Sequence, residues 1–469
     1  MIQVSVEHVD IAPGNAVEWT LISTEASGPV PETAPYQDGH TSYNQAKHFT
    51  VAQSAREADD PIRAYVAGSF ELRGPVDRDA LGAAFLHLVR RHEVLRCTFQ
   101  QLVGDVRCEP GAPESMELKE EDLGFIDSAD GVREYLHRTF QRIDPLAWPL
   151  IVMGAILRED GATVWFACDH LVTDGLSTPI AVRDLATAYE AYAAGRTPDL
   201  PETGSYLAFS RAQRERNEDL TTADDPRLGR WRKFMADGGS FFPPFPLDIG
   251  VERGSLHPAG NATERLLDAD EVRCLEAVCG DAGGKLFMGL LGAVGVALRK
   301  EGGPDVYRGI MPVSERERGP YEHTMGWFIN TMPIAFSVAD DEEFPAVLAN
   351  VADAFAELLL HRDVPFVKAW QLLAPVEYTT IRAWPYAVNF FSYLDFRRSP
   401  GAEHHLARDA RKHVWLERSN GLCFWLHRCD TGLFMNSVYA DTPRARDTRA
   451  ALTATLRRTV KNLARTGAF

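Results

Sequence analysis

Hydrophobic positions in the middle of the first half of the chain predict a β-hairpin. Residues 150–157 and 163–168 are two apolar, partly β-branched runs, each of a length typical of a strand. The residues that join them include Asp160 and Gly161, which favour a tight turn. We therefore expect two neighbouring antiparallel strands, the second of which ends near residue 168.

Helical periodicity recurs before and after this hairpin. Asp77 precedes a run from Leu81 to Val89 in which apolar residues recur three and four positions apart, so Asp77 is expected to cap a helix. Residues 342–360 and 443–463 show the pattern of two further long helices. Strand and helix patterns alternate along most of the chain, which indicates a mixed α+β protein.

The organisation of the chain is predicted to be two halves. Residues 1 to about 38 read as loop-rich, and the polar, proline-containing stretch 195–205 is the best linker. This linker divides the chain into residues 1–205 and 206–469, each a mixed α+β unit.

Composition and charge narrow the classes of function. The 469 residues carry a net charge of −17, which argues against nucleic acid or an anionic membrane as a partner. The longest apolar run, residues 286–298, is too short to span a bilayer, and the N-terminus lacks a signal-peptide pattern. Seven cysteines form no CxxC pair, and no zinc motif is present, so we expect a cytoplasmic protein without a metal.

The most informative segment is residues 166–177, FACDHLVTDGLS. A strand delivers His170 into a short loop that closes with Asp174 and Gly175, and an imidazole fixed in this way can act as a general base near neutral pH. A single histidine after a strand is more often structural, and Asp-Gly alone is simply a turn. HxxxDG by itself therefore leaves both interpretations open.

Neighbouring motifs extend the pattern over most of the chain. Residues 91–99 (RHEVLRCTF), 325–333 (MGWFINTMP) and 361–366 (HRDVPF) accompany the HxxxDG segment, with Ser42-Tyr-Asn44-Gln45 before them and Tyr206-Leu-Ala-Phe209 between them. In this order they resemble the condensation domains of nonribosomal peptide synthetases, their chloramphenicol acetyltransferase relatives and the polyketide-associated acyltransferases. The resemblance covers roughly residues 40 to 465 and implies two acetyltransferase-like subdomains in a V with a central channel.

Two features depart from the family pattern. The family motif is HHxxxDG, and its first histidine is Asp169 here, so His170 inherits the reactive role and Asp169 is expected to support the loop. Residues 404–410 (HHLARDA) imitate the motif more literally. They follow a loop, end in Ala410 where the turn needs glycine, and lie out of motif order, so we interpret them as a charged surface loop or crossover.

The resemblance implies a thioester donor and a nucleophilic amine or alcohol acceptor that meet at His170. Asp174 would be buried and paired with Arg96, Arg308 or Arg316, and Gly175 would permit the turn and offer its N–H to an oxyanion. The expected catalytic residues are thus His170, Asp174 and Gly175, and the expected substrate-binding residues are Asp169, Ser177, Asn330 and Ser392.

The implied partners are small molecules and a carrier. No cofactor is expected to be tightly bound, because the donor would arrive on phosphopantetheine, carried by an acyl- or peptidyl-carrier protein or by coenzyme A. We expect a free-standing monomer that docks an acidic carrier through a local basic surface, either Arg397, Arg398, Arg408, Arg411 and Lys412 or Arg457, Arg458, Lys461 and Arg465.

Three functions remain open from the sequence. The first is an acyltransferase that makes an amide or ester in secondary-metabolite biosynthesis. The second is a catalytically silent, condensation-like module that binds carrier proteins, which the missing first histidine would explain. The third is cyclisation or epimerisation on the same scaffold. Cyclisation is disfavoured because relatives of that type have aspartates in place of the motif histidines, whereas His170 is kept.

Overall fold

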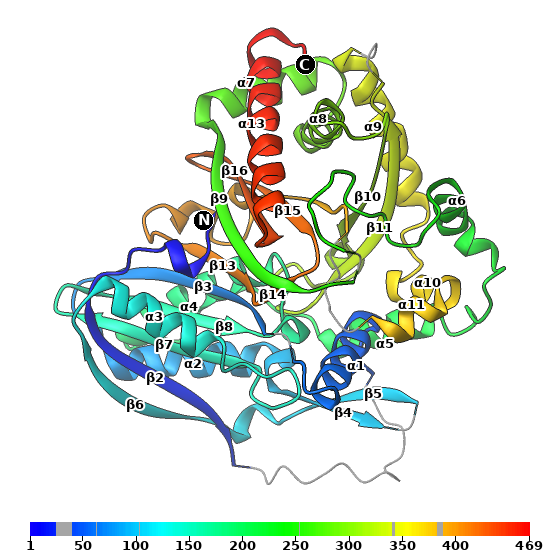
Figure 1. Cartoon of the computed structure of the whole chain (residues 1–469). Coiled ribbons are helices and arrows are strands. Elements are labelled where there is room, and N and C mark those ends of the chain that lie inside the picture. Colours follow the sequence, from blue (N-terminus) through cyan, green and yellow to red (C-terminus); the bar gives the residue numbers. More distant parts are fainter. Residues whose placement is uncertain (25–39, 62, 103, 253, 340–342, 382–387) are drawn as a thin grey trace.

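The computed structural model describes residues 1–24, 40–61, 63–102, 104–252, 254–339, 343–381 and 388–469. Figure 1 shows two sheets with their covering helices, one mainly in the blue-to-cyan part of the chain, with one orange strand (residues 411–416), and one in the green-to-red part. The mixed α/β class is confirmed. The V shape and the central channel stay predictions.

The first sheet has seven strands in the order β1-β13-β3-β8-β7-β2-β6. All of its neighbouring pairs are antiparallel except β1 with β13. The predicted hairpin is confirmed, since β7 and β8 are adjacent and antiparallel. The bounds are β1 Ile2–Gln3, β2 Gly14–Ser23, β3 Ala64–Arg73, β6 Met116–Ile126, β7 Ile151–Arg158, β8 Gly161–Cys168 and β13 Arg411–Leu416.

Strand β8 is buried on both faces and therefore reads as a continuous apolar run. Val164 and Phe166 face a core that includes side chains of α2 (Arg78–Arg91) and α4 (Ser177–Ala193). Trp165 faces the opposite core, to which α3 (Ala129–Phe140) contributes. This double packing fixes the direction in which the chain leaves β8, and the candidate site begins directly after it.

Two expectations about the first half need qualification. Residues 1 to about 38 are not all loop, because β1 and the ten-residue β2 lie within the first 23 of them; residues 25–39 lie outside the described part. The alternation of Trp19 and Leu21, which are buried, with the exposed Thr20 is the strand signal that was overlooked. Strand β13 comes from the later part of the chain, so the boundary at residue 205 stays a prediction.

The second sheet has five strands in the order β12-β15-β16-β9-β14. A separate antiparallel pair, β10-β11, is linked to the start of β12 by a bridge between Ile310 and Phe390. The bounds are β9 His257–Asp268, β10 Val306–Ser314, β11 Ile329–Ser337, β12 Phe391–Asp395, β14 Arg418–Ser419, β15 Leu422–Cys429 and β16 Gly432–Ala440.

Four long helices pack with the second sheet into one apolar core. They are α7 (Ala269–Asp281), α8 (Leu286–Lys300), α9 (Phe344–Leu360) and α13 (Pro443–Thr466), and the last two confirm the predicted helices. In Figure 1, α13 is the red helix beside α7 and α8.

The remaining helices connect the two sheets or cover their ends. Helix α1 begins with a capping box in which Ser42 and Gln45 exchange hydrogen bonds, and this helix supplies several contacts to the candidate site. The bounds are α1 Tyr43–Glu57, α5 Tyr206–Glu215, α6 Gly229–Gly238, α10 Phe366–Leu373, α11 Pro375–Thr380 and α12 Ala402–His405, and a small hairpin is formed by β4 Cys97–Leu102 and β5 Asp105–Pro110.

Candidate active site

His170 lies at the start of the short loop that follows β8, as the sequence predicts. A single 3-10 turn covers residues 170–172, and α4 begins at Ser177. The backbone N–H of Asp169 donates to the carbonyl of Leu150 at the start of β7, which continues the hairpin pairing up to the histidine. The loop is therefore fixed at both ends by regular structure.

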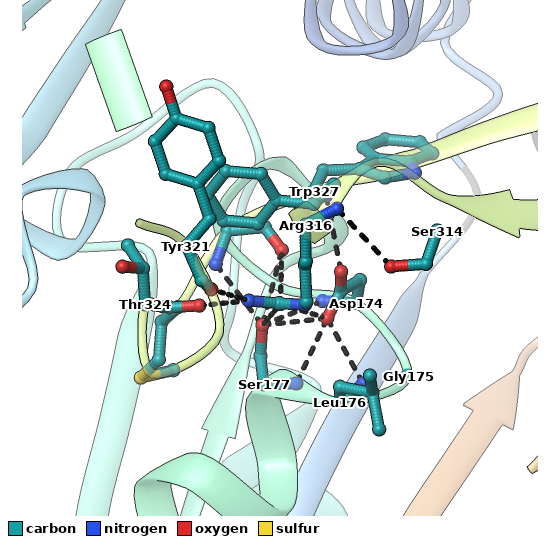
Figure 2. Close-up of polar contacts among 12 residues, drawn as sticks. Asp174, Gly175, Leu176, Ser177, Ser314, Arg316, Tyr321, Thr324 and Trp327 are labelled. Atoms are coloured by element: carbon teal, nitrogen blue, oxygen red, sulfur yellow. Dashed lines mark hydrogen bonds and ion pairs between the residues drawn. The ribbon is translucent and has the colours of Figure 1, made fainter. Parts of the chain in front are cut away.

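Asp174 is buried and is the acceptor at the centre of a polar cluster (Figure 2). Its Oδ1 accepts hydrogen bonds from the N–H and hydroxyl of Ser177, each at 2.9 Å, and from Arg316 Nη2 at 2.8 Å. Its Oδ2 accepts from the N–H of Phe328 at 3.1 Å. Burial alone would raise the pKa of Asp174, but the charge and hydrogen bond of Arg316 outweigh burial and hold the pKa below its ordinary value.

Arg316 is thus the partner of Asp174 among the three arginines that the sequence left open. Arg316 also donates to the carbonyls of Tyr321 and Thr324, and its guanidinium lies 4.5 Å from the ring centre of Phe328. Arg96 instead donates to backbone carbonyls, at 3.0 Å for that of Gly111. The ion pair joins the His170 loop to the segment 315–328 that connects β10 to β11 (Figure 2).

Ser177 is fully buried, and its hydroxyl is engaged within this cluster. Besides donating to Asp174, the hydroxyl oxygen accepts the N–H of Gly326 at 3.1 Å. These contacts fix the turn between the loop and α4. A role for Ser177 in substrate binding stays a prediction.

Asp169 is buried and bonded to a histidine from a distant helix. Its Oδ1 accepts the N–H of Leu171 at 2.8 Å and the Nε2 of His48, on α1, at 3.1 Å. Burial alone would raise the pKa of Asp169, but the effects of His48 and of the Leu171 N–H are together larger and hold the pKa below its ordinary value. The side chain is therefore a carboxylate. The residue that departs from the family motif is therefore held in place from both its own loop and α1.

The His170 imidazole is enclosed by aromatic and titratable neighbours. The Trp327 ring lies 4.0 Å away and the His48 ring 6.4 Å away, centre to centre. Burial and then the proximity of His48 lower the pKa of His170 to about 4, although Asp169 and Asp174 act in the opposite direction. The imidazole is therefore neutral at neutral pH, and its Nδ1 has no hydrogen-bond partner in the described residues.

Gly175 is packed between the two parts of the chain. Its carbonyl accepts a hydrogen bond from the buried Lys412, on β13, at 3.1 Å, and burial lowers the pKa of this lysine to about 8. A Cβ at position 175 would lie 3.1 Å from Leu394. Glycine is favoured here by this close approach, and an oxyanion role for its N–H stays a prediction.

The other predicted substrate-binding residues lie in the second half. Asn330 is buried, donates to the carbonyls of Arg362 and Val364 and accepts the N–H of Phe366, so it binds the turn that precedes α10. Ser392 lies in β12 and is 7% exposed. Contact of either residue with a substrate stays a prediction.

The segment 91–96 is structural in its observed contacts. His92 is fully buried, donates to Asp184 Oδ2 at 2.9 Å and accepts the N–H of Met325 at 3.2 Å. Arg91 makes an ion pair with the same carboxylate at 2.8 Å. These contacts connect α2 and α4 to Met325 in the 315–328 segment, which also binds Asp174.

The first predicted docking surface is largely neutralised by its own neighbours. Arg397 pairs with Asp395, Arg408 with Glu190 and Arg411 with Asp409, while Lys412 is buried. Docking of a carrier at this surface or at Arg457, Arg458, Lys461 and Arg465 stays a prediction. The motif-like segment 404–410 begins in α12 and ends directly before β13; it follows no strand, but His405 and Ala410 are buried, so the segment is not simply the charged surface loop that was expected.

The sequence assigned no role to two residues of the site, His48 and Trp327, and it marked a third, Gln45, only as part of a motif. His48 and Trp327 contact the His170 environment, and the side chain of Gln45 donates to the carbonyl of Leu171 at 2.7 Å. Asn44, which donates to the carbonyl of Ile329 at 2.7 Å, and His48 are four positions apart on α1 and therefore lie on one helix face. This spacing from a motif residue is the sequence signal that could have indicated His48. Trp327 stands inside the motif segment 325–333, where no sequence pattern assigns a role to the tryptophan.

Neither a metal nor a membrane span is indicated for the described residues. Within them, no group of three or more histidine, cysteine, aspartate or glutamate side chains is arranged to hold a metal ion. No single described helix has both the length and the apolar character needed to cross a bilayer, and the one helix pair that passes together, α7 with α8, is bent by 97°.

Comparison with known proteins decides the family. The model of the condensation domain matches residues 57–375, which is more than half of the chain and includes the His170 loop and the Asp174 cluster. The chain belongs to the condensation-domain family. The expected fold and the resemblance to condensation domains are therefore confirmed at the level of the family, and the roles of the individual motif residues stay predictions.

A relative that matches this condensation domain over nearly its whole length is an acyltransferase. The chain is 26% identical to acyltransferase PapA3 of Mycobacterium tuberculosis over 98% of its own length and 96% of that protein. It is also 30% identical to part of the chondramide synthase of Chondromyces crocatus, over 65% of its length and 8% of that protein. The solved structure of PapA2 acyl transferase matches with a TM-score of 0.84 over 99% and 100% of the two chains at 22% identity, which supports the fold. The protein is an acyltransferase of this family.

Proposed function

We propose that the protein transfers an acyl or peptidyl group from a thioester to an amine or alcohol, forming an amide or ester in secondary-metabolite biosynthesis. The donor is carried on phosphopantetheine, either of a carrier protein or of coenzyme A. The observation that carries the proposal is the position of His170 in a short loop that Asp169 and Asp174 fix on either side, with its ring 4.0 Å from that of Trp327 and its Nδ1 without a hydrogen-bond partner in the described residues.

His170 acts as the general base. Its Nε2 accepts the proton of the acceptor O–H or N–H while the nucleophile forms a bond to the thioester carbonyl carbon. The tetrahedral intermediate then expels the thiolate, the C–S bond breaks, and the proton passes from Nε2 to the sulfur. The buried, aromatic surroundings keep the imidazole unprotonated before the reaction, which general-base catalysis requires.

Asp174 and Asp169 position the loop that carries His170. Asp174 anchors the C-terminal side of the loop to Arg316, and Asp169 anchors the N-terminal side to His48. The carboxylate at position 169 therefore does not remove support for the loop; it replaces one hydrogen-bonding side chain by another with a matching partner. This arrangement supports an active enzyme over a catalytically silent module.

The test is acyl transfer measured by intact mass. Candidate acyl-carrier proteins and acyl-coenzyme A donors are incubated with trial amines and alcohols, with wild-type protein and His170→Ala. General-base assistance contributes about 10²–10⁴-fold, so the variant is expected to lose activity by that factor. His404→Ala, in the motif-like surface segment, is the matched control and should retain full activity. An undiminished rate for His170→Ala contradicts the proposal.

The silent-module alternative makes a separate prediction. If the protein only binds carrier proteins, wild type shows no transfer with any donor, and Asp169→His leaves activity at background. Gain of activity in Asp169→His would instead identify an enzyme that lost its function through this substitution. Cyclised or epimerised products in the same mass and chiral analysis would support the third function.

A further inference from the structure

A cavity of about 590 Å³ runs alongside α1 and reaches the Asp169–His48 pair. One wall is the face of α1 from His48 to Arg56, and eight residues of helix span about 12 Å. The opposite wall is formed by residues 138–146, which end α3 and lead to β7. His48 is 8% exposed, and Arg56 has a half-exposed side chain, so the cavity extends from the surface to the site.

Four arginines line this cavity, which is unexpected in a chain of net charge −17. They are Arg56, Arg63, Arg138 and Arg142, and only two acidic residues, Asp144 and Asp169, line it with them. The side chains of Arg56, Arg138 and Arg142 are about half exposed or more, and the lining also includes apolar side chains, with Val51, Ala55 and Leu146 among them. A positive mouth and an apolar wall together favour a ligand with an anionic end and a less polar body.

Two of the arginines have little compensating charge. Arg56 pairs with Asp144 and Arg142 with Glu18. The Arg138 guanidinium is 3.5 Å from Glu134, and both side chains are more than two thirds exposed, a geometry in which an ion pair is weak. Arg63 makes a 3.5 Å contact to the Gln141 side-chain oxygen, and within the described chain its guanidinium has no carboxylate partner. Both guanidinium groups are available to an anion.

The inner end of the cavity also has unused hydrogen-bonding capacity. Asp169 is a carboxylate and can only accept, so the His48 Nε2 carries the proton of their 3.1 Å hydrogen bond. The opposite nitrogen, Nδ1, is buried and has no partner among the described residues. In a neutral ring this atom has a free lone pair, which suits a hydroxyl or amide N–H of a bound substrate.

We infer that this cavity binds one of the two substrates through an anionic group, a phosphate, sulfate or carboxylate, held at the exposed, arginine-lined end of the cavity. The arginines at the mouth hold the anion, the apolar wall contacts the body, and His48 contacts a polar atom next to the reacting centre. That the bound anion belongs to a substrate rests on the proposed acyl transfer. The binding of an anion in the cavity does not depend on turnover.

Two sources have this chemistry, and kinetics separates them. The phosphates of a coenzyme A or phosphopantetheine donor are one source, and an acidic acceptor is the other. Arg63→Gln with Arg138→Gln removes two positive charges while it keeps long polar side chains. An increased KM for the donor alone identifies the donor, an increased KM for the acceptor alone identifies the acceptor, and unchanged values for both contradict the inference.

Direct binding keeps the inference testable when no substrate pair is known. Pyrophosphate is titrated calorimetrically at low ionic strength into wild type, the Arg63→Gln/Arg138→Gln variant and a control, Arg444→Gln/Arg446→Gln, which changes the charge equally at exposed positions of α13. We expect the cavity variant to bind about tenfold more weakly and the control to match wild type. Equal affinity in all three proteins, or no binding to wild type, overturns the anion site. If the cavity variant alone binds pyrophosphate more weakly but wild type transfers no acyl group, the anion site stands and only the proposed function is contradicted.

Discussion

The Nε2 of His48 lies 3.1 Å from Oδ1 of Asp169, so the residue that departs from the family motif is paired with a side chain 121 positions earlier. The pair connects α1 to the loop that carries His170. A buried carboxylate without such a partner would destabilise the folded protein, because burial disfavours the charged form. His48 and Asp169 are therefore expected to behave as one unit.

Removal of His48 is expected to reduce catalysis without unfolding the protein. His48→Ala leaves the Asp169 carboxylate unpaired and lets the loop shift, and misplacement of a catalytic group by about 1 Å costs on the order of 10²-fold in rate. His48→Gln with Asp169→Asn keeps a neutral hydrogen bond and should recover part of the loss. The measurements are kcat and a thermal melt for each variant, and a kcat for His48→Ala equal to wild type would show that the pair has no positioning role.

Breaking the Asp174–Arg316 pair is expected to destabilise the fold. Both side chains are buried, and loss of one partner of a buried ion pair typically costs about 3–5 kcal/mol. Arg316→Ala should lower the free energy of unfolding by this amount in urea titrations. Arg446→Ala removes an exposed pair with Asp441 and should cost less than about 1 kcal/mol. Similar losses for the two variants would mean that the Asp174 cluster does not fasten the loop to the 315–328 segment.

The pH dependence of kcat/KM should reflect the low pKa of His170, because kcat/KM reports the ionisations of the enzyme before substrate binds. The base is active when neutral, and its pKa is about 4, so activity should stay level from pH 8 to pH 6 and fall only as the pH approaches 4. Initial rates measured after a rapid pH jump record this acidic fall in activity before the protein unfolds in acid. A midpoint near the ordinary histidine value of about 6.5 would show that the imidazole is solvated in the working enzyme.

Three buried histidines outside the site predict an acid-sensitive fold. Burial lowers the pKa of His413 to about 4 and those of His405 and His427 to about 3. Their unfolded pKa is about 6.5, so below pH 6.5 the unfolded chain binds more protons, and stability falls as the pH decreases toward the folded values.

The expected loss between pH 8 and pH 5 is on the order of 1–2 kcal/mol for each histidine, measured by urea unfolding. His413 donates its Nδ1–H to the carbonyl of Val4 and accepts from Ser69, so His413→Gln keeps polar partners but cannot be protonated. This variant should show a shallower pH dependence than wild type. An identical slope would exclude His413 as a source of the acid sensitivity.

Local features of the site were predictable, and its long-range contacts were not. The β7–β8 hairpin, the position of His170 after β8 and the N-cap of α2 at Asp77 follow from neighbours in the sequence. The choice of Arg316 over Arg96 and Arg308 depends on how a loop 142 residues away folds back, which no local pattern contains. His48 was overlooked for the same reason, since a histidine on a helix acquires its role only when the helix is packed.

Because β13 lies between β1 and β3, the first sheet cannot be completed until the late residues 411–416 have been synthesised. Residues 411–416 pair with β1 on one side and β3 on the other, so both of those strands keep an open edge until almost the entire chain has left the ribosome. Open strand edges promote association between chains. A nascent or truncated chain that stops at residue 205 should therefore aggregate, and the first sheet should depend on chaperones or on rapid completion of synthesis during expression.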